Sequence, residues 1–167
     1  DVHVYLPPGY EADTDRRYPV LYLHDGQNVF DGATAYVCGQ EWQVDEAAEA
    51  LIATGQIRPL IIVAIDHAGH DRAHEFVPTR AGSPEAGGHA DAYGRFLLDE
   101  LKPFIDARYR TRPEAAHTAI GGSSLGGLVS LHLGLTRASE IGGLLVMSPS
   151  LWWDRRIMLE RYTELAS

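Results

Sequence analysis

Two glycines flank a serine, each two residues away, in Gly122-Ser123-Ser124-Leu125-Gly126. A serine hydroxyl becomes an accessible nucleophile when a sharp strand-to-helix turn holds it clear of a sheet, and such a crowded turn needs neighbours without side chains. Residues 117–120 before the pattern suit a strand, and residues 128–133 after it suit a helix. Amide hydrogens at that helix N-terminus can stabilise a developing oxyanion. We therefore predict that Ser124 is a nucleophile for attack on a carbonyl carbon.

The same five residues have a plainer interpretation, a glycine-rich turn in which the serine caps a helix. Ser123 is the neighbour most easily confused with the nucleophile. It occupies the variable position inside the motif, so its side chain is expected to point elsewhere.

Strands and helices are predicted to alternate along the chain. Apolar patterns predict strands at 1–6, 18–24, 60–65, 117–120 and 143–147. Apolar residues at helical spacing predict helices at 41–52, at 89–109 with a bend or break at Pro103, after the Ser124 turn, and at 154–165. The polar, glycine-containing segment 66–88 is predicted to be loop.

This alternation, with fully apolar strands, predicts an α/β fold in which helices cover both faces of a mostly parallel sheet. At 167 residues and 18.3 kDa the chain suits one domain that spans residues 1–167. The chain begins without a methionine in a strand-like segment and ends within a predicted helix. We therefore expect an incomplete domain, whether a fragment, a truncated gene product or a partly given chain.

The composition disfavours several classes of function. A formal charge of −9 disfavours binding to a nucleic-acid backbone, which requires a basic surface. No apolar run approaches the length of a membrane span, and the first residues do not form a signal segment. The single cysteine, Cys38, rules out an internal disulfide and is predicted to be a packed or partly exposed thiol.

Four stretches, one of them the Ser124 pattern, follow one another in an order that is typical of one family. They are YPVLYLHDGQN (18–28), RAHEFVP (72–78), GSSLGG (122–127) and SPSLWW (148–153). Together they resemble the esterase branch of the α/β-hydrolase superfamily, which includes enterochelin-esterase-like enzymes, feruloyl and acetylxylan esterases and the mycolyltransferases. The resemblance implies an α/β-hydrolase-type fold and serine ester hydrolysis through an acyl-enzyme, with no metal and no organic cofactor.

An oxyanion hole needs two preorganised donors beside the nucleophile. Turn geometry points to the backbone N–H of Leu125, the residue after Ser124. The resemblance implies that the backbone N–H of Gln27 is the second donor, although residues 25–28 also fit a simple polar turn. Trp152 and Trp153 follow the last strand, and we expect them either to wall the acyl pocket or to be ordinary core aromatics.

Three histidines close together in the chain raise the hypothesis of a metal site. His67, His70 and His74 could converge on one ion, with two nearby aspartates. Solvated loop histidines are the plainer interpretation, and we predict no metal. The same stretch overlaps the arginine-and-glutamate segment of the family, in which we expect Arg72 and Glu75 to form a structural ion pair.

The groups that activate the nucleophile are harder to find. In this fold a carboxylate and then a histidine follow the serine along the chain. The only histidine after Ser124 is His132, two turns into the helix and on the wrong side for Ser124. The resemblance implies that both groups follow strands absent from residues 1–167, so we expect the sheet to lack its C-terminal strands. Asp154 is the candidate acid if the carboxylate lies one strand earlier.

We predict a serine carboxylic-ester hydrolase whose substrate is a small-molecule or carbohydrate-linked ester. The alternative is a catalytically incomplete fragment, or a binding module without turnover. Such a chain is expected to pair an exposed sheet edge after Met147 with a second copy. The sequence does not choose between a cytoplasmic and a secreted protein.

Overall fold

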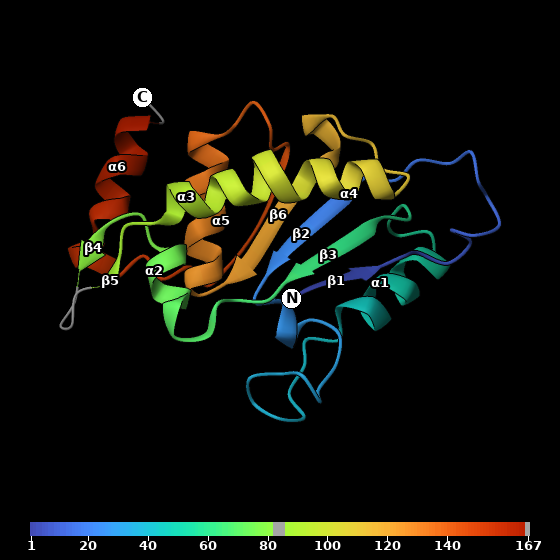
Figure 1. The fold of residues 1–167 in the computed structure, drawn as a ribbon, viewed down its shortest axis with the longest axis horizontal. Coiled ribbons are helices and arrows are strands. Elements are labelled where there is room, and N and C mark those ends of the chain that lie inside the picture. The colour runs from blue at the N-terminus through green and yellow to red at the C-terminus, as the bar shows by residue number, and fades with distance from the viewer. Residues whose placement is uncertain (82–85, 166–167) are drawn as a thin grey trace.

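A computed structural model describes residues 1–81 and 86–165 of the chain. At its centre lies a five-stranded sheet with the strand order β1-β3-β2-β6-β7 (Figure 1). The strands are β1 (Val2–Tyr5), β2 (Val20–His24), β3 (Ile61–Ile65), β6 (Thr118–Ser123) and β7 (Gly143–Met147). β1 runs antiparallel to β3, and all the other neighbours are parallel. The predicted strands and the mostly parallel sheet are therefore confirmed.

The parallel register brings the ends of three strands together. His24 at the end of β2 lies opposite Ile65 at the end of β3, and Leu23 lies opposite Gly121 of β6. The segments that follow these strands consequently meet at one edge of the sheet, which is the edge where open α/β folds bind their ligands.

The predicted 89–109 helix is continuous but not uniform. It runs as α3 (Ala90–Arg95), a π-helical segment η3 (Phe96–Leu101) and α4 (Lys102–Arg108). Pro103 lies in the first turn of α4. Proline has no N–H to donate to the preceding turn, and the wider π turn directly before α4 accommodates that missing bond.

Helices cover both faces of the sheet, as predicted. On one face Tyr22, Val63 and Ile120 lie in a core with side chains of α3, η3, α4 and α5 (Leu125–Thr136). Figure 1 shows α3 and α4 running across the strands on this face. On the other face Leu23 and Ile62 pack with side chains of α1 (Val44–Ala53). The alternation of side chains along β2 and β3 thus feeds two separate cores. A short turn, η4 (Ala115–His117), precedes β6.

The segment 66–88 is not simply loop, and that prediction was wrong in part. It contains η2 (Gly69–Asp71), α2 (Arg72–Phe76), β4 (Arg80–Ala81) and β5 (Ala86–Gly87). Phe76 is fully buried, with its ring 5.0 Å from that of Tyr93. A single buried aromatic anchors α2, so no periodic apolar stripe was there to be recognised.

The last strand in sequence, β7, forms the lateral edge of the sheet opposite β1. Leu144 and Leu145 of β7 are 45% and 43% exposed, so this strand is less covered than the central ones. The last helix, α6 (Ile157–Leu165), begins later than predicted, because Asp154 and Arg155 in η5 (Trp153–Arg156) have positive φ angles of 45° and 54°. Of the helices in the described ranges, none is both long enough and apolar enough to cross a bilayer.

Candidate active site

Ser124 is the single residue between β6 and α5, and its backbone has φ 59° and ψ −118°. A positive φ is costly for a residue with a Cβ, so surrounding contacts must hold it in place. The Ser124 N–H donates to the Met147 carbonyl at 3.1 Å, and the Ser124 carbonyl accepts from the N–H groups of Leu128 and Ser150, both at 3.0 Å. The predicted strand-to-helix turn is therefore tied to α5 and to the segment after β7.

The glycines around Ser124 allow this turn to close. A Cβ on Gly122 would lie 2.9 Å from the backbone carbon of Gly126, and a Cβ on Gly127 would lie 2.8 Å from the Met147 oxygen. A Cβ on Gly126 would lie 3.1 Å from Asp25 Oδ2. The first two contacts are too short for a real side chain, so the turn itself requires Gly122 and Gly127. Gly126 instead allows the segment after β2 to approach.

The backbone N–H groups of Leu125 and Gln27, near the carboxyl ends of the strands, have no hydrogen-bond partner within their own helices. The first backbone bond of α5 runs from the Leu128 N–H to the Ser124 carbonyl, so the Leu125 N–H precedes it. Gln27 lies in η1 (Gly26–Asn28), whose first internal bond runs from the Asn28 N–H to the Asp25 carbonyl at 2.9 Å. The Gln27 N–H likewise precedes the first bond of its helix. The roles of Leu125 and Gln27 as oxyanion donors stay predictions.

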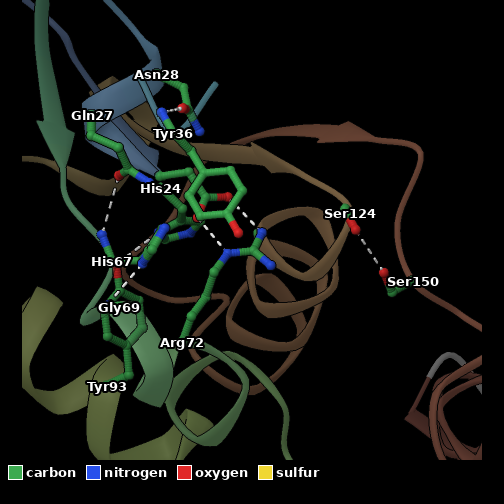
Figure 2. Close-up of polar contacts among 12 residues, drawn as sticks. His24, Gln27, Asn28, Tyr36, His67, Gly69, Arg72, Tyr93, Ser124 and Ser150 are labelled. Atoms are coloured by element: carbon green, nitrogen blue, oxygen red, sulfur yellow. Dashed lines mark hydrogen bonds and ion pairs between the residues drawn. The ribbon is translucent and has the colours of Figure 1, made fainter. Parts of the chain in front are cut away.

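A cavity of about 420 Å³ opens at the carboxyl ends of the strands. Its walls come from the segments after β2 and β3 and from the Ser124 turn. The lining residues are Asp25, Asn28, Tyr36, Trp42, His67, Gly69, Arg72, Ser123 and Ser124. Figure 2 shows Ser124 on one side of this region, and Gln27, His67 and Arg72 on the other.

An ion pair forms part of the wall that faces Ser124. Arg72 Nε donates to Asp25 Oδ1 at 2.6 Å, and Nη2 donates to Oδ2 at 2.8 Å. This bidentate pair joins the residue directly before η1 to the first residue of α2, across 47 residues of sequence, and fixes both side chains. The expected ion pair between Arg72 and Glu75 was therefore wrong, because the guanidinium turns toward the segment after β2. Burial, with the nearby Asp71 carboxylate, raises the pKa of Glu75.

Hydrogen bonds fix the rest of this wall. Asn28 Oδ1 accepts the Tyr36 N–H at 2.8 Å, and the Asn28 carbonyl accepts the Trp42 N–H at 2.7 Å. His67 Nδ1 accepts the Gly69 N–H at 2.9 Å, which leaves the proton of a neutral ring on Nε2. The ring of Tyr36 lies 6.3 Å from the ring of His67. The cavity therefore presents aromatic side chains beside the ion pair.

The Ser124 hydroxyl meets a second hydroxyl. Ser124 Oγ and Ser150 Oγ are 3.0 Å apart, and Figure 2 shows the two side chains directed at each other. Ser150 is buried. Within residues 1–81 and 86–165, no imidazole or carboxylate is hydrogen-bonded to Ser124 Oγ.

The sequence model of the family described as "Putative esterase" matches residues 1–165. The chain belongs to this esterase family. Siderophore triacetylfusarinine C esterase of Aspergillus fumigatus is 30% identical over an alignment of 148 residues, gaps included, that covers 84% of this chain and 47% of that protein. Ferri-bacillibactin esterase BesA of Bacillus subtilis is 28% identical over an alignment of 184 residues, gaps included, that covers 99% of this chain and 59% of that protein.

A solved structure shows which fold the chain shares with its relatives. The IroE-like serine hydrolase from Shewanella oneidensis matches with a TM-score of 0.82 at 27% identity, covering 98% of this chain and 50% of that one. The fold is therefore of the α/β-hydrolase type, as predicted. The chain spans about half the length of these relatives.

The two tryptophans of the stretch that resembles the esterase family lie apart from the Ser124 cavity. They line a separate hollow of about 490 Å³ together with Ala81, Asp154 and Arg155. Trp153 Nε1 donates to the Thr79 carbonyl at 3.2 Å, and the ring packs on a small core that contains Met158. An acyl-pocket role for Trp152 and Trp153, and an acid role for Asp154, stay predictions.

The histidines singled out in the sequence have other partners. His132 Nε2 lies 2.8 Å from Asp91 Oδ1, so this ring faces α3 and not Ser124. His74 Nδ1 accepts the Gly87 N–H at 3.2 Å. In the part of the chain that the structure describes, no three His, Cys, Asp or Glu side chains gather closely enough to hold a metal ion.

A further histidine, His24, is buried at the end of β2. Its Nδ1 lies 2.8 Å from the Tyr93 hydroxyl. Burial lowers the pKa of His24 to about 4, so the ring is neutral at physiological pH. Burial also raises the pKa of Tyr93, which therefore keeps its phenolic proton.

Several residues of the cavity were not recognised in the sequence. Helical spacing places Trp42 on a helix face, whereas α1 begins at Val44 and Trp42 lines the cavity. Tyr36 lies in a segment without any periodic pattern. Asp25 and Arg72 both lie in stretches that resemble the family, but nothing in their spacing indicates that they pair. Cys38 is exposed, so the prediction of a packed or partly exposed thiol was wrong.

Proposed function

We propose that this chain carries the nucleophile and the oxyanion donors of a serine carboxylic-ester hydrolase. The observation that supports this most strongly is the φ of 59° at Ser124, between β6 and α5. A strained backbone at a residue other than glycine persists where the surrounding structure enforces it, commonly at active sites. Membership of an esterase family supports the same reaction.

In the proposed reaction, Ser124 Oγ attacks the ester carbonyl carbon and its proton passes to a general base. The new C–O bond turns the carbonyl oxygen into an oxyanion, toward which the N–H groups of Leu125 and Gln27 donate. Collapse of this intermediate breaks the bond to the alcohol, which leaves with a proton, and an acyl-enzyme remains. Water then attacks the acyl group, releases the acid and returns the proton to Ser124. We assign the base to none of the described residues.

We propose a small-molecule or carbohydrate-linked ester as the substrate, with siderophore esters as the first class to examine. One relative named above is a siderophore triacetylfusarinine C esterase, and the other is a ferri-bacillibactin esterase. Tyr36 and Trp42 offer aromatic contacts beside the Arg72 cation in the cavity. No feature supports nucleic acid as a partner, since the chain carries a formal charge of −9.

The burst of p-nitrophenol from p-nitrophenyl acetate tests this proposal. Wild type is expected to release about one equivalent as the acyl-enzyme forms, and Ser124→Ala is expected to release none. Ser123→Ala is the matched control, because this substitution lies one residue before Ser124 and leaves the neighbouring glycines unchanged. A burst that survives in Ser124→Ala, or none in wild type, contradicts the proposal.

We also propose that the chain associates with a second copy of itself through β7. This is the alternative in which the chain is a module that assembles as an oligomer. Leu144 and Leu145 are exposed on this edge strand, and an unpaired edge is a template for another strand. Sedimentation velocity is expected to show dimers or larger species, and Leu145→Lys is expected to shift them toward monomer. A monodisperse wild-type monomer contradicts this proposal and leaves the esterase proposal standing.

A further inference from the structure

We propose that Ser150 is a positioning residue, whose hydroxyl bonds Ser124 Oγ and selects the rotamer from which Ser124 attacks. This inference rests on the proposed function, because it gives a role to the partner of the proposed nucleophile. Ser150 touches no atom of the substrate in this proposal and acts through Ser124.

Ser150 is fixed from three directions. Its N–H donates to the Ser124 carbonyl at 3.0 Å, and its carbonyl accepts the Trp153 N–H at 3.1 Å. Its Oγ lies 3.0 Å from Ser124 Oγ, and the residue is only 2% exposed. A buried hydroxyl needs a partner, and within the described ranges Ser124 Oγ is the one that Ser150 Oγ has.

The chain before Ser150 is shaped to bring it to this place. Ser148 has a φ of 40°, a conformation that residues with a side chain rarely adopt. The ring of Pro149 fixes the next φ, and the Pro149 carbonyl accepts the Leu151 N–H at 2.7 Å. A turn constrained at two successive residues has little freedom, so Ser150 Oγ is a fixed point beside the Ser124 turn.

The backbone of Ser124 is equally constrained, which leaves its χ1 rotation as the main freedom of the hydroxyl. That rotation has three staggered wells, and the bond to Ser150 favours one of them. A net hydrogen bond shifts such an equilibrium by a factor of about ten, which makes one rotamer dominant. With Ser150 as donor, the proton of Ser124 remains free for transfer to a base. The same bond then stabilises negative charge as it develops on Ser124 Oγ.

Inactivation of the 167-residue chain by a fluorophosphonate tests the inference. The limiting rate and the half-saturating concentration are measured between pH 5 and 9 for wild type, Ser150→Ala, Ser150→Cys and Ser130→Ala. Ser130 is the matched control, since it is a fully buried serine whose Oγ donates to the Gly126 carbonyl at 2.7 Å. Thermal unfolding of each variant establishes that it is folded.

For Ser150→Ala we expect a limiting rate about tenfold below wild type, an unchanged half-saturating concentration and a pH profile displaced to higher pH. Ser150→Cys is expected to recover part of the rate, because a thiol is a weaker donor than a hydroxyl. Ser130→Ala is expected to react at the wild-type rate.

A wild-type rate in Ser150→Ala overturns the inference, and so does an equal loss of rate in Ser130→Ala. If Ser150→Ala does not fold, Ser150→Cys decides, with a rate several-fold below wild type supporting the inference and an unchanged rate overturning it. A wild-type chain that takes no label overturns the proposed function, and this inference with it, so the two failures are distinguishable.

Discussion

The two walls of the cavity are built in different ways. On the Ser124 side, backbone geometry sets the positions: a positive φ, close contacts that only glycines allow, and bonds between main-chain groups. On the opposite side, side chains from distant segments set them, since Asp25 and Arg72 are 47 residues apart in sequence. One wall depends on local sterics and the other on a charge pair.

The two walls are therefore expected to fail under different changes. Contacts between main-chain groups do not depend on protonation or on a partner side chain, so the Ser124 turn should respond to added volume. A carboxylate held at low exposure depends on its cation, so the other wall should respond to the loss of one charge. Substitutions that remove a charge and substitutions that add volume should therefore lower the free energy of unfolding by different amounts, and the largest effect is given first.

The largest loss is expected for Arg72→Met. This change leaves the Asp25 carboxylate, 4% exposed, without its bidentate partner. Breaking a buried pair costs about 3–5 kcal/mol, and the partial exposure of Arg72 places our expectation near the lower end, about 3 kcal/mol by urea unfolding. Arg137→Met is the matched control, because its partners Asp99 and Glu140 are exposed, and it should cost less than about 1 kcal/mol. Equal losses contradict the distinction.

The buried His24 next to Asp25 is expected to make stability depend on pH. Its pKa is about 4 in the folded chain and 6.5 when unperturbed. Between these values the unfolded chain binds more protons, so stability is complete above pH 6.5 and falls as the pH drops toward 4. When His24 is fully protonated in the unfolded chain and still neutral in the folded chain, the free energy of unfolding is lower by up to about 3 kcal/mol.

The measurement is urea unfolding of wild type and His24→Phe at pH 7 and pH 4.5. Between pH 7 and pH 4.5, wild type should lose about 2–3 kcal/mol more of its free energy of unfolding than His24→Phe loses. A difference that does not change with pH contradicts the assignment of a neutral, buried His24.

A smaller loss of stability, about 2 kcal/mol, is expected for Gly122→Ala, whose Cβ meets the Gly126 backbone. Its effect on chemistry should be larger, with fluorophosphonate labelling slowed on the order of a hundredfold because the turn opens. Gly134→Ala in α5, the helix that follows the turn, is the control, since its Cβ meets only the end of the exposed Leu144 side chain, which can turn aside. Labelling of Gly122→Ala at the wild-type rate contradicts a turn held by close backbone contact.

The same contrast explains how much could be predicted from the sequence. The five strands and the Ser124 turn are encoded locally, in apolar runs and in glycine spacing. The structure confirms the positions of the strands and of the strand-to-helix turn. The pairing of Arg72 with Asp25 depends on the register of β2 and β3, which no local pattern contains. The position of Trp42 depends in the same way on where α1 begins. The start of α6 was missed because Asp154 and Arg155 leave the helical region without a glycine or proline to mark it.

The position of the covalent adduct after reaction with a fluorophosphonate shows whether Ser124 is the nucleophile. Trypsin should release residues 111–137 as one peptide, since the Arg112–Pro113 bond resists cleavage, and this peptide contains Ser123, Ser124 and Ser130. Fragmentation by mass spectrometry then assigns the modified residue. We expect the adduct on Ser124 alone. An adduct on Ser123, or on any residue outside this peptide, contradicts this expectation.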